Sequence, residues 1–184
     1  MDKSNIFNNM ISEIKIIDKK IYTDFRGYTA ILYDASVAKN LDFHIVQINQ
    51  GFSIKPYILR GMHYQEEPHA QAKLVSCLYG SIYNVAVDIR PDSPMFGKCT
   101  AEVLTAENQK SMYIPKGFAH GYLTLEPNTL MQWCVDEDFC AEAAKCLRWD
   151  SVGIPWPGNA EEYVISAKDR NGIDLNSLRE LHEL

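Results

Sequence analysis

Several patterns that would assign this chain to a specialised class of protein are missing from its sequence. No segment approaches the ~20 apolar residues of a transmembrane helix, and residues 1–5 lack the apolar run of a signal peptide. Acidic residues outnumber basic ones, 24 against 18, whereas proteins that bind nucleic acids usually carry a basic surface. We therefore expect a cytoplasmic protein whose partners are neither membranes nor nucleic acids.

Cysteine pairing is absent as well. The cysteines number five, with no C-x-x-C pair among them: Cys77, Cys99, Cys134, Cys140 and Cys146. An odd number without zinc-type spacing predicts free thiols in a reducing compartment.

No repeat, linker or low-complexity run divides the 184 residues, so we expect one domain with a full core. Short apolar segments punctuated by Gly and Pro predict strands at 14–17, 30–33, 43–49, 73–78, 81–89, 99–104, 111–114, 121–125 and 129–135. This spacing is typical of an all-β antiparallel barrel or sandwich. Only the tail, from about residue 174, has helical spacing, with Leu175, Leu178 and Leu181.

Two polar clusters lie among the predicted strands. The first contains Arg60, His63, Gln65, Gln71 and Lys73, and the second is Pro115-x-Gly117-x-x-His120. An imidazole is a natural base near neutral pH, a guanidinium can clamp phosphate, and an ammonium group can stabilise an oxyanion. The first cluster therefore suits a polyanionic substrate with an acidic C–H bond. Structural roles remain open, with His63 or His120 as core imidazoles and Lys73 as a surface amine.

The second cluster matches half of the sequence signature of cupin β-barrels. Cupins that bind a metal also need a His-x-His with a following Glu upstream, but here the upstream element is His63-Tyr64-Gln65. Two histidines without a third ligand make a poor metal site, so we expect no metal.

The chain resembles the dTDP-4-dehydrorhamnose 3,5-epimerase family, which are metal-free cupins. The matching motifs are Arg26-Gly27, Gln47 with Asn49, Leu59-Arg60-Gly61-x-His63-Tyr64-Gln65, Gln71-x-Lys73-Leu74-Val75, Gly80, Val85-Ala86-Val87-Asp88-Ile89-Arg90, Ser93-Pro94-x-Phe96-Gly97, Ile114-Pro115-x-Gly117-Phe118-Ala119-His120-Gly121, Trp149-Asp150, Gly153-Ile154-x-Trp156-Pro157 and Ser166-Ala167-Lys168-Asp169. The resemblance implies a cupin-type double-stranded β-helix, a jelly-roll barrel, with a short C-terminal helix.

The resemblance also implies a reaction. The substrate would be a nucleotide diphosphate-linked 4-keto-6-deoxyhexose, epimerised at C3 or C5 or both through an enolate, for surface polysaccharide or deoxysugar synthesis. His63 would be the base, oriented by Asp169, and Lys73 would stabilise the enolate oxygen. The sugar ketone is the electron sink, so no cofactor is implied.

Substrate binding is implied for a wider set of residues. The diphosphate would contact Arg26, Arg60 and Lys168, with His120 as a further candidate, and the nucleoside would contact Gln47 and Asn49. In the family, the turn that carries Arg26 crosses into a partner subunit, which implies a homodimer with exchanged N-terminal strands.

Four positions depart from the family pattern. Trp133 replaces the tyrosine that returns the proton on the opposite face of the sugar, and an indole N–H cannot do so at neutral pH. Phe139 replaces a second tyrosine, Asn84 an aspartate and Ile31 a glutamate. The replacement acid is open among Tyr64, Tyr83, Tyr113 and Tyr122.

These departures leave several functions open. The chain could be an epimerase for one or both carbons, or act on a sugar linked to CDP or GDP. It could be a ketoisomerase or dehydratase that uses the same enolate. It could also be a non-catalytic nucleotide-sugar-binding cupin in which Trp133 and Phe139 form stacking surfaces, or a metal cupin.

Overall fold

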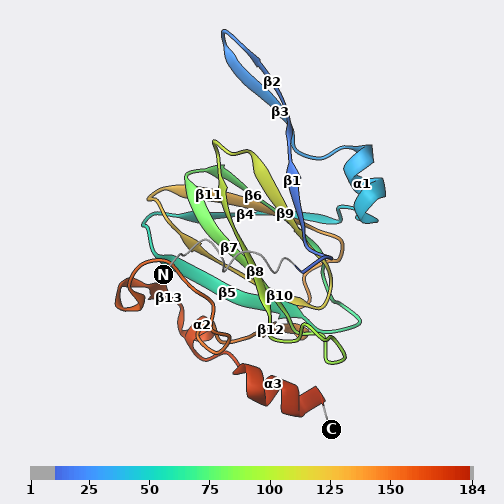
Figure 1. Ribbon diagram of the computed structural model, residues 1–184, viewed down its shortest axis with the longest axis vertical. Coiled ribbons are helices and arrows are strands. Elements are labelled where there is room, and N and C mark those ends of the chain that lie inside the picture. The colour runs from blue at the N-terminus through green and yellow to red at the C-terminus, as the bar shows by residue number, and fades with distance from the viewer. Residues whose placement is uncertain (1–10, 183–184) are drawn as a thin grey trace.

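The computed structural model describes residues 11–182 and shows two β-sheets packed face to face (Figure 1). The five-stranded sheet has the order β1-β9-β6-β11-β4. Its strands are β1 (Lys15–Asp18), β4 (Gln47–Ser53), β6 (Lys73–Tyr79), β9 (Lys110–Ile114) and β11 (Thr129–Val135).

The second sheet has the order β12-β5-β10-β7-β8, with β13 paired to β5. Its strands are β5 (Ile58–Gln65), β7 (Ser81–Asp88), β8 (Cys99–Thr105), β10 (Phe118–Thr124), β12 (Ala144–Cys146) and β13 (Val164–Ile165). The expected all-β jelly-roll barrel is confirmed. The expected C-terminal helix is α3 (Leu175–His182).

Strands β2 (Lys20–Asp24) and β3 (Gly27–Ile31) form a separate hairpin that projects from the barrel (Figure 1). The turn between them holds Phe25 and Arg26. Residues 1–10 and 183–184 lie outside the described residues, so the sequence prediction for residues 1–5 is not addressed by the structure.

Two further helices correct the expectation that only the tail is helical. Helix α1 (Ala35–Leu41) begins where the Asp34 carboxylate accepts hydrogen bonds from the Ser36 and Val37 N–H groups, which is a standard N-cap. Helix α2 (Ala167–Arg170) is capped by Ser166. Both helices are shorter than the window in which helical periodicity is visible in a sequence.

Two predicted strands were displaced, and the strand expected at 30–33 is found as β3 at 27–31. The expected strand at 43–49 is found as β4 at 47–53, with Gln47 opposite Val135 of β11. Phe43 instead packs with Leu74 and Cys134 in a cluster that Val37 and Leu41 of α1 also contact. Burial of Phe43 in this cluster accompanies the later start of β4, and the Val46 N–H is the first to donate to β11, at the Val135 oxygen at 2.8 Å.

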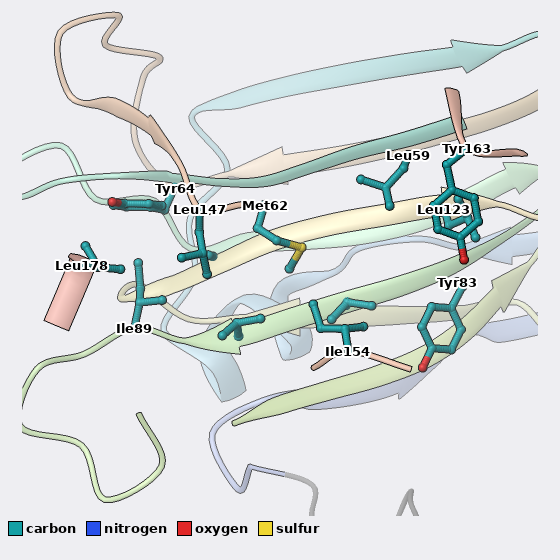
Figure 2. Packing of buried hydrophobic residues seen from close by; sticks show 13 residues of the cluster. Leu59, Met62, Tyr64, Tyr83, Ile89, Leu123, Leu147, Ile154, Tyr163 and Leu178 are labelled. Carbon is teal, nitrogen blue, oxygen red and sulfur yellow. The ribbon is translucent and has the colours of Figure 1, made fainter. Parts of the chain in front are cut away.

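Apolar side chains fill two main layers. The interior cluster lies between the sheets and includes Val75, Ala86, Met112, Phe118 and Met131. An outer cluster covers the other face of the six-stranded sheet (Figure 2). There Leu59, Met62 and Leu123 pack against Leu147 and Ile154 of the C-terminal segment (Figure 2). Side chains that alternate along β5, β7 and β10 thus face either the barrel interior or this outer layer.

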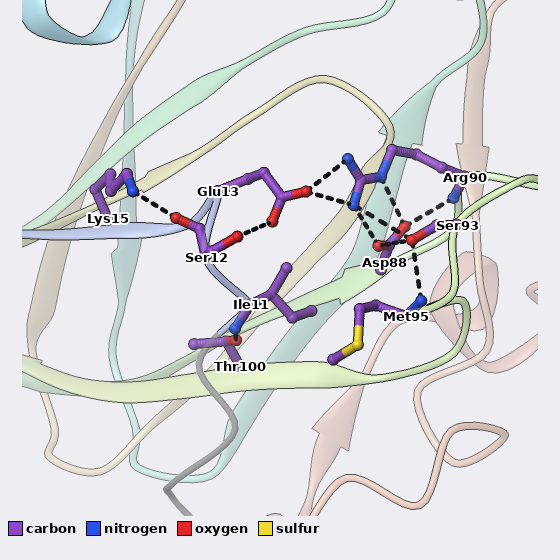
Figure 3. A network of polar contacts seen from close by, with 9 residues as sticks. All are labelled: Ile11, Ser12, Glu13, Lys15, Asp88, Arg90, Ser93, Met95 and Thr100. Carbon is purple, nitrogen blue, oxygen red and sulfur yellow. Dashed lines mark hydrogen bonds and ion pairs between the residues drawn. The ribbon is translucent and has the colours of Figure 1, made fainter.

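A polar network ties the start of the described chain to the barrel (Figure 3). Arg90 donates to the fully buried Asp88 at 2.5 Å and to Glu13 at 3.2 Å, and the Ile11 N–H donates to Thr100 Oγ1. Burial alone would raise the pKa of Asp88, but hydrogen bonds from Arg90 and Ser93 outweigh it and keep the carboxylate charged. The network fixes residues 11–13, which precede β1, against the ends of β7 and β8.

Candidate active site

A cavity of about 320 Å³ opens between the two sheets. Its walls are formed by Arg60, His63, Tyr64, Gln65, Gln71, Lys73, His120, Tyr122, Met131, Trp133, Phe139, Ala144, Lys145 and Lys168. Both polar clusters of the sequence therefore meet in one place, although they come from different strands.

A register irregularity turns Arg60 and His63 towards the same cavity. They are three residues apart, and in a regular strand an odd separation points side chains to opposite faces. His63 pairs with His120, and Arg60 pairs with Tyr122. The two pairs are therefore three residues apart on β5 but only two residues apart on β10. Gly61 absorbs the extra residue with a φ of +124°. This is the geometry of a β-bulge that redirects a side chain.

His63 forms a hydrogen bond with Asp169, Nε2 to Oδ1, at 2.7 Å. Asp169 is buried and also accepts a hydrogen bond from the Gly61 N–H at 3.3 Å. Burial would raise the pKa of Asp169, but the His63 and Gly61 hydrogen bonds outweigh it and the pKa lies below its ordinary value. A charged carboxylate fixes the imidazole tautomer and stabilises its cation, so His63 can accept a proton from a molecule in the cavity.

Lys73 enters the cavity from β6, in the sheet opposite His63. Its side chain is buried, and its Nζ donates to the backbone oxygen of His63 at 3.4 Å. Burial lowers the pKa of Lys73 to about 8, and Asp136 offsets part of this fall. A buried ammonium that is still charged at neutral pH can stabilise a developing oxyanion.

His120 is held as a neutral side chain. It is buried, and its Nε2 lies 2.8 Å from Asn84 Oδ1. Burial, followed by the charges of Lys73 and His63, lowers the pKa of His120 well below its ordinary value. The amide oxygen of Asn84 accepts the Nε2–H proton, which leaves Nδ1 as an acceptor. The amide of Asn84 carries no charge, so unlike a carboxylate it does not support an imidazolium at His120.

Four other predicted site residues lie at the cavity: Arg60, Trp133, Phe139 and Lys168. Trp133 comes from β11, opposite Asn49 of β4. Lys168 lies on α2, the helix that also carries Asp169. Phe139 is exposed at the rim, and its N–H donates to Gln47 Oε1 at 3.2 Å.

Three predicted residues do not line the cavity. Gln47 and Asn49 are hydrogen-bonded to each other at 2.5 Å on β4, and Gln47 reaches the rim only through Phe139. Arg26 stands at the tip of the projecting hairpin, paired with Asp24 at 2.5 Å. Within one subunit, therefore, the structure does not bring these three to His63.

Sequence reasoning missed Met131, Ala144 and Lys145 as cavity residues. Met131 was visible as part of a predicted strand, and alternation with Trp133 places both on one face. Lys145 lies on the short strand β12, opposite Tyr64. No sequence motif marks β12, because three residues are too few to show periodicity.

Among residues 11–182, one trio of side chains offers potential metal ligands, and the ligand atoms of His63, Cys146 and Asp169 lie within 4.8 Å of one another. Their chemistry does not suit a resident cation. Burial, and then the charge of Asp169, raises the pKa of the Cys146 thiol to about 11, whereas a metal binds the thiolate. Four cationic side chains, of Arg60, Lys73, Lys145 and Lys168, also line this cavity.

The barrel and its paired histidine and aspartate beside a cationic cavity define a cupin-type isomerase. Residues 8–177 match the family model described as dTDP-4-dehydrorhamnose 3,5-epimerase. The chain belongs to the dTDP-4-dehydrorhamnose 3,5-epimerase family.

Known members are similar in both sequence and structure. The enzyme named dTDP-4-dehydrorhamnose 3,5-epimerase from Sinorhizobium fredii is 39% identical over 172 residues, which cover 91% of this chain and 88% of that protein. The crystal structure of the 3,5-epimerase from Legionella pneumophila, in complex with dTDP-4-keto-L-rhamnose, has 37% identity and a TM-score of 0.86, covering 94% of this chain and 93% of that one.

A member with a narrower reaction is also similar in structure. The 3'-monoepimerase from Streptomyces bikiniensis, in complex with dTDP-quinovose, has 25% identity and a TM-score of 0.86. That comparison covers 94% of this chain and 88% of the other. Enzymes that invert one carbon and enzymes that invert two thus share this fold.

Proposed function

We propose that this chain epimerises a dTDP-linked 4-keto-6-deoxyhexose at C3, at C5 or at both. The observation that carries the proposal is the His63–Asp169 hydrogen bond of 2.7 Å at a cavity with buried Lys73 in the opposite wall. The C4 ketone acidifies the neighbouring C–H bonds. His63 removes one of these protons while Lys73 stabilises the enolate oxygen.

The cationic side chains supply the binding of the diphosphate. Arg60 and Lys168 line the cavity mouth, and a guanidinium can hold phosphate oxygens through two hydrogen bonds. The similar structure from Legionella holds a dTDP-linked keto sugar, which supports dTDP as the nucleotide. Trp133 and Phe139 offer aromatic faces, and Gln47 and Asn49 lie beside them for the nucleoside. His120 lies close enough to His63 to contact the sugar.

We also propose that one domain forms the subunit and that two subunits pair through the β2–β3 hairpin. The hairpin exposes Ile21, Tyr22, Phe25 and Tyr28, with Phe25 98% exposed. Several exposed large apolar side chains on one hairpin are typical of an interface. Docking of the hairpin on a partner would carry Arg26 to the partner's cavity, where it can bind the diphosphate. A nucleotide-sugar substrate and five unpaired cysteines favour a cytoplasmic location.

Inversion of a single carbon is the second candidate. Trp133 stands in the cavity wall, at the position where the resemblance implies a tyrosine, and a similar structure is a 3'-monoepimerase. A change of the proton donor can alter which carbon is reprotonated from the opposite face.

Proton NMR of the protein with dTDP-4-keto-6-deoxyglucose in deuterium oxide tests the proposal. We expect deuterium at C3, at C5 or at both, and loss of this exchange in His63→Asn. His44→Asn is the matched control, because His44 is exposed and does not line the cavity. Absence of exchange in the unaltered protein, or full exchange in His63→Asn, would refute the assignment.

A further inference from the structure

Inversion at carbon requires a proton donor on the side of the sugar that His63 does not occupy. The wall opposite His63 is made by Met131 and Trp133 of β11, and neither side chain is an acid at neutral pH. Lys73 also comes from that sheet, but its Nζ donates to the His63 backbone oxygen at 3.4 Å, and its proposed role is to stabilise the enolate oxygen. The donor must therefore come from another element.

The structure narrows the choice among the tyrosines. Of the ten, all of which are described, only Tyr64 and Tyr122 line the cavity. Tyr64 borders it, but its ring packs in the outer cluster with Leu147 and Leu178 (Figure 2). Tyr83 lies in the same outer cluster (Figure 2). Tyr113 donates its hydroxyl proton to the Leu41 backbone oxygen at 3.4 Å, outside the barrel interior.

Tyr122 reaches across the barrel. Its backbone is on β10, in the sheet that carries His63, and its ring stacks beside His120 with centroids 6.4 Å apart. Its hydroxyl oxygen lies 3.0 Å from the position that a Cβ on Gly51 would occupy, and an atom of the Trp133 ring lies 3.4 Å from that same position. Gly51 belongs to β4, next to β11. The hydroxyl is thus presented at the wall opposite His63, beside the very residue that replaces the family tyrosine.

The absence of a side chain at Gly51 makes this placement possible. A Cβ there would crowd the hydroxyl of Tyr122 and the ring of Trp133. The hydroxyl of buried Ser53 can donate a hydrogen bond to the Tyr122 oxygen, which favours the phenolate and partly offsets the rise that burial causes in the pKa of Tyr122. With Ser53 as the donor, this bond does not use the Tyr122 O–H proton, which can pass to a molecule in the cavity.

The groups around Tyr122 stabilise both its protonated phenol and the phenolate that forms when the proton leaves. Burial raises the pKa of Tyr122, so the hydroxyl carries its proton at neutral pH, while the charge of Arg60 acts in the opposite direction. Arg60 is the direct cross-strand neighbour of Tyr122. A guanidinium in this position stabilises a phenolate once the proton has left.

We propose that Tyr122 is the proton donor of this enzyme, in place of the family tyrosine at position 133. The assignment rests on the proposed epimerase function. After His63 has taken a proton from carbon, the Tyr122 O–H bond breaks and a new C–H bond forms on the opposite face of the enolate. The ketone is restored, and Tyr122 is left as a phenolate and His63 as an imidazolium. Water then returns a proton to the phenolate and removes one from His63, which completes the cycle.

Tyr122→Phe tests this assignment because it removes one oxygen and keeps the stacked ring. With dTDP-4-keto-6-deoxyglucose in deuterium oxide, we expect formation of the inverted product to fall ~10²–10⁴-fold, the contribution of one general acid. Exchange of deuterium without inversion should continue, because His63 can return a proton to the face from which it came. Adding Trp133→Tyr to Tyr122→Phe should restore inversion from β11.

Tyr83→Phe is the matched control, since its hydroxyl is buried without a hydrogen-bond partner among the described residues and lies outside the cavity. An unchanged rate of inversion in Tyr122→Phe would overturn the assignment alone. Loss of exchange together with inversion would also overturn it, because Tyr122 would then serve binding or folding. No exchange in the unaltered protein would overturn the proposed function and this assignment with it.

Discussion

At the scale of single residues, burial determines which side chains of the site are charged. Lys73 and His120 are both buried, and in each the charged form is disfavoured. The Lys73 pKa falls only to about 8, so this ammonium survives at neutral pH. His120 faces the Asn84 amide and remains neutral. The cavity therefore offers one buried cation beside one neutral imidazole.

The pH dependence of the reaction should report Lys73. The charged form is present below a pKa of about 8 and is lost above it, so kcat/KM should decline by ~10-fold per pH unit in the alkaline limb. Steady-state rates between pH 6 and pH 10 measure this decline. In Lys73→Arg the side chain stays charged to much higher pH. The kcat/KM that this variant retains should therefore not decline above about pH 8. The same limb in both proteins would show that another group titrates.

At the scale of elements, the pairing of β5 with β10 determines the site. The irregular register places Arg60 and His63 on one face, and Gly61 makes it possible. A Cβ on Gly61 would lie 2.5 Å from the Gly121 Cα and 2.7 Å from the His120 oxygen. Both contacts are with backbone atoms, so no side-chain rotation can relieve them.

Gly61→Ala should therefore destabilise the protein and displace His63. We expect a loss of ~3 kcal/mol or more in the free energy of unfolding, at the high end for single substitutions, measured by urea denaturation. Gly153→Ala is the control, because Gly153 also has a positive φ, +70°, but nothing lies within 4 Å of its added Cβ. In Gly153→Ala, the backbone strain of the positive φ alone should lower the free energy of unfolding by ~1 kcal/mol. Equal losses in the two variants would contradict a steric role for Gly61.

At the scale of the whole molecule, the hairpin is the feature that a single subunit leaves unexplained. It projects at one end of the long axis, and α3 lies at the other end (Figure 1). Among the described residues, no helix has the length and apolar character needed to cross a membrane. Pairing with a second copy of the chain, as proposed above, would bury the exposed ring of Phe25.

Phe25→Asp should convert a dimer into a monomer of 21.0 kDa, measured by light scattering after gel filtration. Phe25 is 98% exposed, so the subunit itself should lose little stability. Leu181→Asp is the control, since Leu181 is exposed on α3 at the opposite end. A Phe25→Asp protein with the mass of the unaltered dimer, or an unaltered protein that is already monomeric, would refute the hairpin interface.

The sequence by itself determined the barrel class, the family and the chemical types at the site. Short strands between Gly and Pro, and motifs such as the one around His63, are formed by residues that are neighbours in the chain. They can therefore be recognised without knowledge of the tertiary structure. The same locality explains the errors: α1 is only seven residues long, and burial of Phe43 shifted β4 along the chain.

Only the tertiary structure decided which residues meet. Asp169 joins His63 across 106 positions of sequence, and the bulge at Gly61 turns Arg60 to the same side as His63. The sequence left four tyrosines as equal candidates for the proton donor. Among the described residues, packing places only the hydroxyl of Tyr122 beside Trp133, in the cavity wall opposite His63. These outcomes depend on strand register and on which sheet face is covered, and both are set by contacts between segments that are distant in the chain.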